Sequence, residues 1–497
     1  MKKLTLILIA VLILLHTYPA VSFAQNSSIQ EEIFYDILVD RFNNGNQAFS
    51  EQVRVDDPLA YHGGDLEGIK LKLDDLKELG FTAISLSPIM ENSENGYHGY
   101  WVEDFYTVEE QFGTMEDLQL LVQEAHKRDM KVVLELVVNY VSNTNPIVSD
   151  PEKKDWIIED SSVETYDEPW LENVSILNQE NTEVQEMLID MAKYWLEEGN
   201  LDGLKIHAAD QASPEFLTTL TREIKEEKSE VYVIADTLSN EAPKELFNID
   251  TIDIVENSIL SQTIVDVLAE VDKPISEIYE KWDEIENKNG LIYLDNKTMD
   301  RFTQVAAINK RDDVNTWMLG LTYLLTTPGV PSVFQGSDVP MYGSGIEQVH
   351  QLVNFNSGDP ELEEVFSKAL ALRTQFPALQ YGDFELVGSD EGMSVFKRSY
   401  EDQTVYIAIN NDSVSRTVSL MDIEPGIQLR GLLGDNLARQ LDNGEYRIGL
   451  ARETADVYII EEDSGVNWGF VAPIIIVLLL FIVGVVYLTR KQKKTRS

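Results

Sequence analysis

The chain has 497 residues, with 39 Lys and Arg against 86 Asp and Glu, which gives a formal net charge of −47 at pH 7. Such a charge repels nucleic-acid phosphates and anionic lipid surfaces, so nucleic-acid binding is excluded as a main function. Hydrophobic residues make up 43% and charged residues 25%, as in ordinary globular proteins. The absence of Cys excludes disulfides, thiolate metal ligands and cysteine nucleophiles, so a bound metal would need oxygen or His ligands.

The two ends of the chain have the features of membrane segments. Two lysines, an apolar run and small residues within 1–24 have the layout of a secretory signal peptide. Residues 468–488 carry no charge, and a helix of that length spans a hydrocarbon core of about 30 Å. With the basic cytoplasmic tail at 489–497, the positive-inside rule predicts a single-pass type I protein of the cell membrane with an extracellular ectodomain.

Between these ends, the apolar pattern alternates between the periods of strands and helices. The expected strands are 33–39, 82–86, 131–138, 201–207, 231–236 and 291–294, and the expected helices are 66–79, 115–129, 181–198 and 213–228. Sustained over 31–375, this alternation favours an α/β fold, the closed eight-fold β/α (TIM-type) barrel. The polar segment 141–179 is expected to be an insertion after the third strand. Short alternating strands over 376–461 predict a C-terminal β-sandwich domain.

Several segments carry a more specific signal. They are FYDILVDRFNNGN (34–46), YHGGDLEGIKLKLDDLKELGFTAISLSPI (61–89), GYHGYWVEDFY (96–106), FGTMEDLQLLVQEAHKRDMKVVLELVVNY (112–140) and TTPGVPSVFQG (326–336). In this order and spacing, they resemble the α-amylase family of glycoside hydrolases, over about residues 31 to 461. The resemblance implies the same barrel, a domain inserted after the third strand, a C-terminal β domain and an ancestral reaction on α-linked glucans.

The catalytic positions are where this chain departs from the family. A retaining glycosidase needs a carboxylate nucleophile and a carboxylic acid about 5 Å from it. The resemblance places His207 at the nucleophile position, Asp236 at the proton-donor position and Thr298 at the third-carboxylate position. Because only one of the three is an acid, we expect the family reaction to be disabled. Asp210 and Asp300 are nearby acids that would have to substitute in a rearranged site.

The resemblance also supplies candidate ligand-binding residues. The positions that would contact sugar are His98, Tyr100, Trp101, Tyr140, Lys205 and Lys297. His207 and Thr298 replace two of the family's acids, whereas Lys205 stands for an Arg and Lys297 for a His. This leaves a formal charge of about +1 at the family's positions, so the site is expected to be positive. We therefore expect carbohydrate binding, with an anionic wall glycan favoured over a neutral glucan.

Calcium is the one cofactor that the sequence suggests, as a structural ion, and no organic cofactor is expected. Asn139 matches a calcium ligand of the family, and Asn44, Asn46 and Asp65 partly match a second calcium loop. Hard oxygen ligands of this kind suit Ca²⁺. The same residue types also form turns and helix caps, which is the alternative role for each.

Three functions remain open. We favour a membrane-anchored, external amylase-like domain without efficient glycosidase activity that binds a glycan or a partner. The second is an active α-glucan hydrolase or transglycosylase with rearranged acids. The third is a structural ectodomain of a membrane complex, with a membrane-protein partner. Product analysis distinguishes the second function, and co-purification from membranes distinguishes the third.

Overall fold

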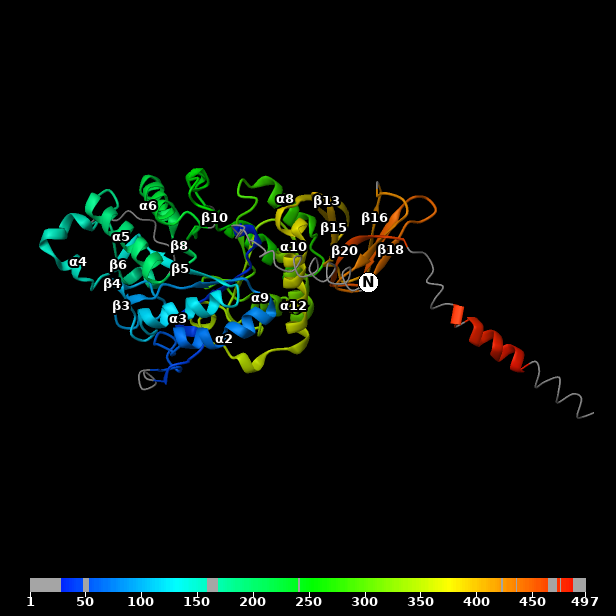
Figure 1. The fold of residues 1–497 in the computed structure, drawn as a ribbon, viewed down its shortest axis with the longest axis horizontal. Coiled ribbons are helices and arrows are strands. Elements are labelled where there is room, and N and C mark those ends of the chain that lie inside the picture. Colours follow the sequence, from blue (N-terminus) through cyan, green and yellow to red (C-terminus); the bar gives the residue numbers. More distant parts are fainter. Residues whose placement is uncertain are drawn as a thin grey trace, which may run out of the picture.

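The computed structural model describes residues 28–47, 53–158, 169–239, 242–421, 423–434, 436–463, 472–473 and 475–485. The predicted signal peptide, 1–24, and the predicted cytoplasmic tail, 489–497, lie outside these residues. The body of the molecule is a barrel with a smaller sheet domain beside it, formed by the C-terminal strands drawn in orange in Figure 1.

Eight parallel strands form the barrel. They are β1 (Phe34–Ile37), β2 (Ala83–Leu86), β5 (Lys131–Val137), β8 (Gly203–His207), β9 (Tyr232–Ala235), β10 (Ile254–Val255), β11 (Leu291–Ile292) and β12 (Val330–Phe334). They pair in the order β10-β9-β8-β5-β2-β1-β12-β11, and a parallel bridge between Glu256 and Leu291 closes the ring. Every strand residue but Lys131 is buried, as expected for strands covered on both faces. The predicted eight-fold barrel is confirmed.

Helices cover the outside of the barrel (Figure 1). They include α2 (Leu66–Leu79), α3 (Met115–His126), α5 (Thr182–Glu198), α6 (Pro214–Glu227), α7 (Ser258–Leu268), α8 (Ser276–Glu284), α9 (Phe302–Ile308), α10 (Asp313–Thr326) and α12 (Pro360–Gln375). In α5, Val184, Leu188, Met191 and Trp195 recur at helical spacing and are all buried. Polar side chains cap the first turn of these helices except α8 and α9, as when Asn181 accepts hydrogen bonds from the first turn of α5.

Two excursions extend the loops at the C-terminal ends of the strands. After β2, β3 (Met90–Asn92) and β4 (Val102–Val108) form a hairpin. After β5, β6 (Tyr140–Ser142) and β7 (Val174–Ile176) pair as an antiparallel ribbon. The chain between β6 and β7 forms α4 (Pro146–Ser149) and two short 3₁₀ helices, Pro151–Trp156 and Pro169–Asn173. The segment predicted as an insertion therefore leaves the barrel and returns to it at α5.

The C-terminal strands form an antiparallel sheet domain. Its six-stranded sheet contains β13 (Asp383–Asp390), β14 (Met393–Tyr400), β15 (Gln403–Asn410), β17 (Ile427–Gly431), β18 (Leu437–Arg439) and β20 (Thr454–Glu462), and β16 (Arg416–Leu420) pairs with β19 (Tyr446–Leu450). Buried side chains from both sheets, such as Val395 and Ile448, share one apolar cluster. A C-terminal β domain was predicted, and it is present.

A buried amide joins this domain to the barrel. The side chain of Asn411 donates hydrogen bonds to the carbonyl oxygens of Val267, Glu270 and Lys273, at 3.1, 2.9 and 3.0 Å. Its Oδ1 accepts a hydrogen bond from Arg311 at 2.5 Å. The C-terminal domain thereby completes the end of α7, which the barrel leaves with open carbonyl groups.

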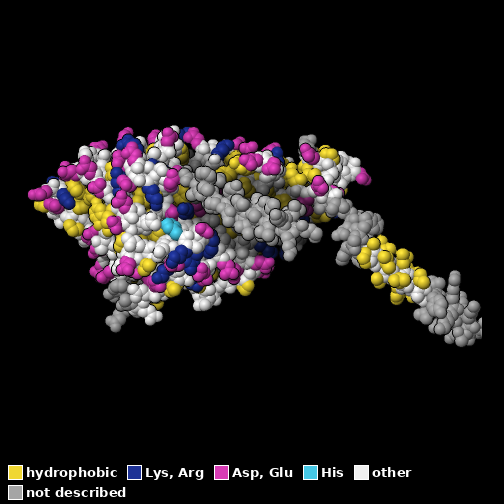
Figure 2. Space-filling view, viewed as in Figure 1, with side chains coloured by type: hydrophobic (Ala, Val, Ile, Leu, Met, Phe, Trp, Pro, Cys, Tyr) yellow, Lys and Arg dark blue, Asp and Glu magenta, His cyan; other side chains and the backbone are white. Residues whose placement is uncertain are grey.

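The membrane segment predicted at 468–488 is described only over residues 472–473 and 475–485. In the part of the chain that the structure describes, no helix is long and apolar enough to cross a membrane. Figure 2 shows Asp and Glu side chains, in magenta, spread over the visible face of the barrel with Lys and Arg between them. This distribution agrees with the large excess of acidic residues.

Candidate active site

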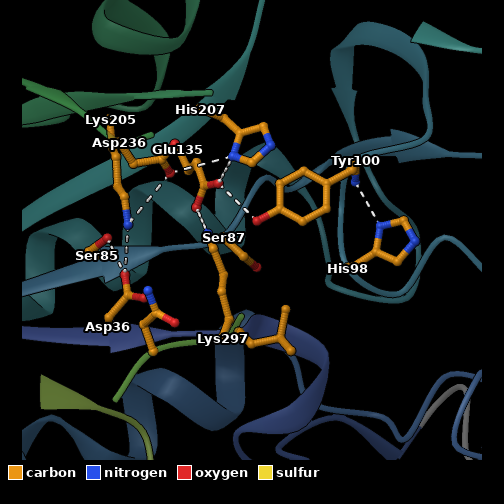
Figure 3. A network of polar contacts seen from close by, with 12 residues as sticks. Asp36, Ser85, Ser87, His98, Tyr100, Glu135, Lys205, His207, Asp236 and Lys297 are labelled. Carbon is orange, nitrogen blue, oxygen red and sulfur yellow. Dashed lines mark hydrogen bonds and ion pairs between the residues drawn. The ribbon is translucent and has the colours of Figure 1, made fainter. Parts of the chain in front are cut away.

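The C-terminal half of the barrel holds a cluster of buried charged side chains. They are Asp36 on β1, Glu135 on β5, Lys205 and His207 on β8, Asp236 after β9, Glu256 after β10 and Lys297 after β11. All are less than a tenth exposed. Figure 3 shows that side chains from separate strands point toward one another here, with Lys297 reaching Glu135 from the opposite side to His207. Buried charges are tolerated when they are paired, and the six members other than Glu256 form ion pairs with one another.

His207 lies at the centre of this cluster. Its Nδ1 is 3.0 Å from Oε1 of Glu135 and 3.4 Å from Oδ2 of Asp236. The ring of Tyr100 stacks on the imidazole at 4.4 Å, and the Tyr100 hydroxyl donates to Glu135 at 3.0 Å. Burial alone would lower the pKa of His207, but the two carboxylates outweigh it and raise the pKa to about 9. His207 is therefore an imidazolium at neutral pH.

The lysines are paired as well. Lys205 Nζ lies 3.5 Å from Asp36 Oδ1 and 3.9 Å from Asp236 Oδ2, and these charges raise the Lys205 pKa against the effect of burial. Lys297 forms an ion pair with Glu135, whose pKa it lowers although burial acts in the opposite direction. The charges thus alternate along the series Asp36, Lys205, Asp236, His207, Glu135 and Lys297.

Three cations and three anions in this series sum to zero. The positive site that we predicted from Lys205 and Lys297 is wrong, because the prediction left out the buried acids Asp36 and Glu135. The preference for an anionic ligand, which rested on that charge, loses its basis. Glu256, which also belongs to the cluster, adds only negative charge, so a ligand meets no excess of positive charge here.

Two acids on adjacent strands have pKa values displaced in opposite directions. Burial raises the pKa of Asp236, but the His207 charge and hydrogen bond outweigh it, so the net shift is downward. Burial and the nearby charge of Asp236 raise the pKa of Glu256 to about 7. The backbone of Thr237 donates a hydrogen bond to Glu256 Oε2 at 3.2 Å. Asp236 is therefore ionised at neutral pH, whereas Glu256 is protonated in a substantial fraction of molecules.

Both acids line one small cavity, and a larger one adjoins it. The small cavity, of about 30 Å³, is also lined by Lys205, His207, Lys297 and Thr298, and has room for about one water molecule. The larger cavity, of about 640 Å³, lies between the barrel and the β6–β7 ribbon. Leu238 lines both cavities. The two cavities therefore have one lining residue in common, beside the charged cluster.

The aromatic residues predicted to contact sugar lie around the same cluster. The ring of His98 stacks on Tyr100 at 5.4 Å, and the edge of Trp101 meets His98 at 4.7 Å. Tyr140 approaches His207 edge-on at 5.9 Å. Tyr100 is 1% exposed, so it supports the cluster from behind rather than offering an open stacking face.

The two acids suggested as substitutes lie elsewhere. Asp210 accepts hydrogen bonds from the backbone of Leu238 and Ser239, at 2.9 and 3.0 Å. Asp300 accepts from the backbone of Gly345 at 2.9 Å and from the Ser344 hydroxyl. Neither lines the small cavity. Their carboxylates hold loops together.

Two of the predicted calcium ligands, Asp65 and Asn139, accept hydrogen bonds from N–H groups. Asp65 begins α2 and accepts from the backbone nitrogens of Gly68, Asn46 and Gly45, at 2.6, 2.7 and 3.1 Å. Asn44 and Asn46 are exposed in the preceding loop. Oδ1 of Asn139 accepts a hydrogen bond from Gln179 at 2.8 Å. The oxygens of Asp65 and Asn139 face hydrogen-bond donors, so their arrangement does not fit a calcium ion.

Sequence reasoning missed three acids of the cluster, Asp36, Glu135 and Glu256. A signal was present for the first two, because each is the one acid in an otherwise apolar strand segment, FYDI and VVLELVV. An acid in such a strand points inward and needs a partner. Glu256 follows a strand of only two residues, Ile254–Val255, which is too short to show a period.

Comparison with known proteins identifies the family. A profile described as "Alpha amylase, catalytic domain" matches residues 36–373, and one described as "Alpha-amylase C-terminal domain" matches residues 382–458. The chain belongs to the α-amylase family. It is similar to the crystal structure of an Anoxybacillus α-amylase, with 39% identity and a TM-score of 0.84, covering 88% of this chain and 100% of the other.

Further members of the α-amylase family are similar over most of the chain. The structure of an α-amylase from Geobacillus thermoleovorans complexed with acarbose is 37% identical, with a TM-score of 0.82, and the match covers 88% of this chain and 100% of the other. A β/α-amylase of Paenibacillus polymyxa is 27% identical over 87% of this chain. The match covers only 38% of that longer relative.

These comparisons correct two predictions. Among the relatives are cyclomaltodextrinases and maltogenic amylases, which are named as enzymes, so they contradict a binding module without efficient glycosidase activity. That prediction counted the acids lost from the motifs and not the buried acids beside them. An intracellular maltogenic amylase of Bacillus subtilis, 23% identical over 82% of this chain and 73% of its own length, contradicts the predicted type I membrane protein with an extracellular ectodomain.

Proposed function

We propose that this protein cleaves or transfers α-linked glucans, using Asp236 and Glu256 as its pair of catalytic acids. The observation that carries the proposal is the opposite displacement of their pKa values at one cavity, downward for Asp236 and to about 7 for Glu256. Two acids whose pKa values differ in this way are able to act as a carboxylate and a proton donor at the same pH. The family, whose members include α-amylases and cyclomaltodextrinases, supplies the substrate class.

In the proposed reaction, Glu256 gives its proton to the glycosidic oxygen as the bond from that oxygen to the anomeric carbon breaks. The anomeric carbon becomes electron-poor, and the Asp236 carboxylate stabilises it by its negative charge. Water, or a sugar hydroxyl in a transfer reaction, then forms the new bond and returns a proton to Glu256. Lys205 and His207 keep Asp236 ionised without donating to the leaving group.

The two cavities suit this scheme. The sugar chain would lie in the larger cavity and reach the acids past Leu238, which lines both cavities. The smaller cavity has about the volume of the one water molecule that hydrolysis consumes. Glu180 and Gln211, which line the larger cavity, offer polar groups to sugar hydroxyls.

The test is turnover of defined substrates by the full chain. Starch, maltoheptaose and a cyclic maltodextrin are incubated with the wild type, with Glu256→Gln and with Asp236→Asn, and the products are separated by chromatography. The kcat of each variant should fall at least about 100-fold, because a general acid or base usually contributes at least this factor to the rate. The matched control is Asp300→Asn, which changes an acid outside the cavity and should keep the wild-type rate.

Two outcomes would overturn the proposal. One is no turnover by the wild type on any of the three substrates. The other is turnover that Glu256→Gln leaves intact, which would show that the catalytic acid is a different residue. Thermal unfolding of each variant separates a loss of chemistry from a loss of folded protein.

A further inference from the structure

We propose that Gln179 and Asn139 form an uncharged amide relay that positions the turn after β8, and with it His207 and Asp236, at the place where a family-type calcium ion would be expected. The relay residues are positioning residues, since neither belongs to the proposed acid pair. The kinetic part of the test rests on the proposed function, whereas the stability and spectroscopic parts do not.

The orientation of the Gln179 amide is fixed by its neighbours. Its Oε1 accepts a hydrogen bond from the backbone nitrogen of Ser213 at 2.9 Å, and a backbone nitrogen is only a donor. Its Nε2 therefore faces the carbonyl oxygen of Val138, at 3.0 Å, and Oδ1 of Asn139, at 2.8 Å. Gln179 is 8% exposed and uses both ends of its side chain.

Asn139 connects the Gln179 amide to the end of β8 by hydrogen bonds. Because its Oδ1 accepts from Gln179, its Nδ2 is the donor, at 2.7 Å to the carbonyl oxygen of Ala208 and 3.3 Å to that of His207. Ala208 has φ 51°, in the left-handed region that a residue with a Cβ rarely adopts. The backbone nitrogen of Ala208 in turn donates to Asp236 Oδ1 at 2.6 Å. Two amides thus hold a strained turn whose N–H group fixes a buried carboxylate.

The chemistry of this set does not suit a cation. The groups that meet here are two side-chain amides and the carbonyl oxygens of Val138, His207 and Ala208. None carries a formal charge, whereas Ca²⁺ sites in proteins usually include carboxylates. The Gln179 amide places an N–H donor against Oδ1 of Asn139. This hydrogen bond occupies the oxygen that would otherwise bind the cation.

The first test compares Gln179→Ala with Gln185→Ala in thermal unfolding. Gln185 is the matched control, because its side chain donates to the backbone oxygen of Gln179 at 2.6 Å and lies outside the relay. The wild type should unfold at the same temperature in excess chelator and in millimolar Ca²⁺. Gln179→Ala should unfold at a lower temperature than Gln185→Ala. Gln179→Glu, which keeps the shape but replaces the donor with an acceptor, should lose stability in chelator and regain part of it with Ca²⁺.

The second test asks whether the relay positions the site. Gln179→Ala should lower kcat about tenfold or more with little change in KM, whereas Gln185→Ala should change neither. If the wild type proves inactive, the ¹⁵N resonances of the His207 imidazole at a single pH remain as a readout, and they should move in Gln179→Ala alone. A calcium-dependent rise in the unfolding temperature of the wild type, lost in Asn139→Ala, would overturn the proposal. So would His207 resonances that stay in place in Gln179→Ala.

Discussion

Nδ1 of His207 lies 3.0 Å from Oε1 of Glu135, and both side chains are almost fully buried. A neutral imidazole would satisfy Glu135 only weakly, whereas an imidazolium supplies a charge-assisted hydrogen bond. The same Nδ1 also faces Asp236, so one proton serves two carboxylates. Replacing the expected nucleophile with His207 therefore converts a family acid position into the cation that keeps its neighbours ionised.

The first prediction concerns stability against pH. The folded pKa of His207 is about 9, above its ordinary value of 6.5, so protonation favours the folded state. This contribution, of order 3 kcal/mol by linkage, is complete below pH 6.5 and is lost as pH rises through 9. Urea unfolding of wild type and His207→Gln between pH 6 and 10 should show the decline only in the wild type. Parallel curves would contradict the assignment.

The second prediction concerns the pH dependence of turnover. The proposed proton donor Glu256 has a pKa of about 7 and works only while protonated. We expect kcat/KM to fall as pH rises through 7, and to hold at lower pH until Asp236, whose pKa is lowered, takes up a proton. Glu256→Gln should keep a small residual rate, and its kcat/KM should no longer fall as pH rises through 7. If kcat/KM of this variant still falls above pH 7, the fall is caused by the titration of another group.

The third prediction tests the buried pair of Lys297 and Glu135. Lys297→Met should lower the free energy of unfolding by about 3–5 kcal/mol, because it removes a counter-charge from a carboxylate that is 0% exposed. Adding Glu135→Gln should restore part of the loss. The control is Lys288→Met, whose partner Asp283 lies at 2.7 Å on the exposed surface. That change should cost less than about 1 kcal/mol. Equal losses at the two sites would contradict the buried pairing.

The fourth prediction concerns Asp65, which begins α2 and also ties down the loop before it. Asp65→Ala should destabilise the protein by about 1–2 kcal/mol, the usual cost of losing a helix cap. Asp65→Asn keeps an acceptor oxygen and should lose less. Both effects should be the same in chelator and in Ca²⁺ when measured by thermal unfolding. A wild-type advantage that appears only with Ca²⁺ would restore the metal-ligand role.

Much of the barrel could be predicted from the sequence, because its strands and helices keep regular periods. The predicted helix 66–79 coincides with α2, and the strand predicted at 131–138 is one residue longer than β5. Strand β10, Ile254–Val255, was missed because two residues are too few to show a regular pattern of apolar side chains. Its position is instead determined by pairing with its neighbours β9 and β11. Missing that strand also hid Glu256 at its end.

The site was predicted only in part, for a related reason. The motifs led to His207, Asp236, Lys205 and Lys297, which the structure brings together in one cluster. They did not give the charge of the cluster, since pairing across the barrel depends on which strands are neighbours. The ion pair of Lys297 with Glu135 joins residues 162 apart in the chain. Local sequence patterns carry no information about such contacts.

The amide of Asn411 lies at one end of α7, and Glu256, the proposed proton donor, lies beside the other end. The sheet domain is therefore connected to the proposed site through this helix. The Asn411 amide completes the last turn of α7, and the first turn of the same helix is held by Asn257, the residue next to Glu256. Without residues 376–461, the carbonyl groups of Val267, Glu270 and Lys273 would lose the hydrogen bonds from Asn411, and Arg311 would lose those to Asn411 and Glu453. The end of α7 would then be held less firmly. The barrel and the sheet domain should therefore melt in a single cooperative transition in calorimetry.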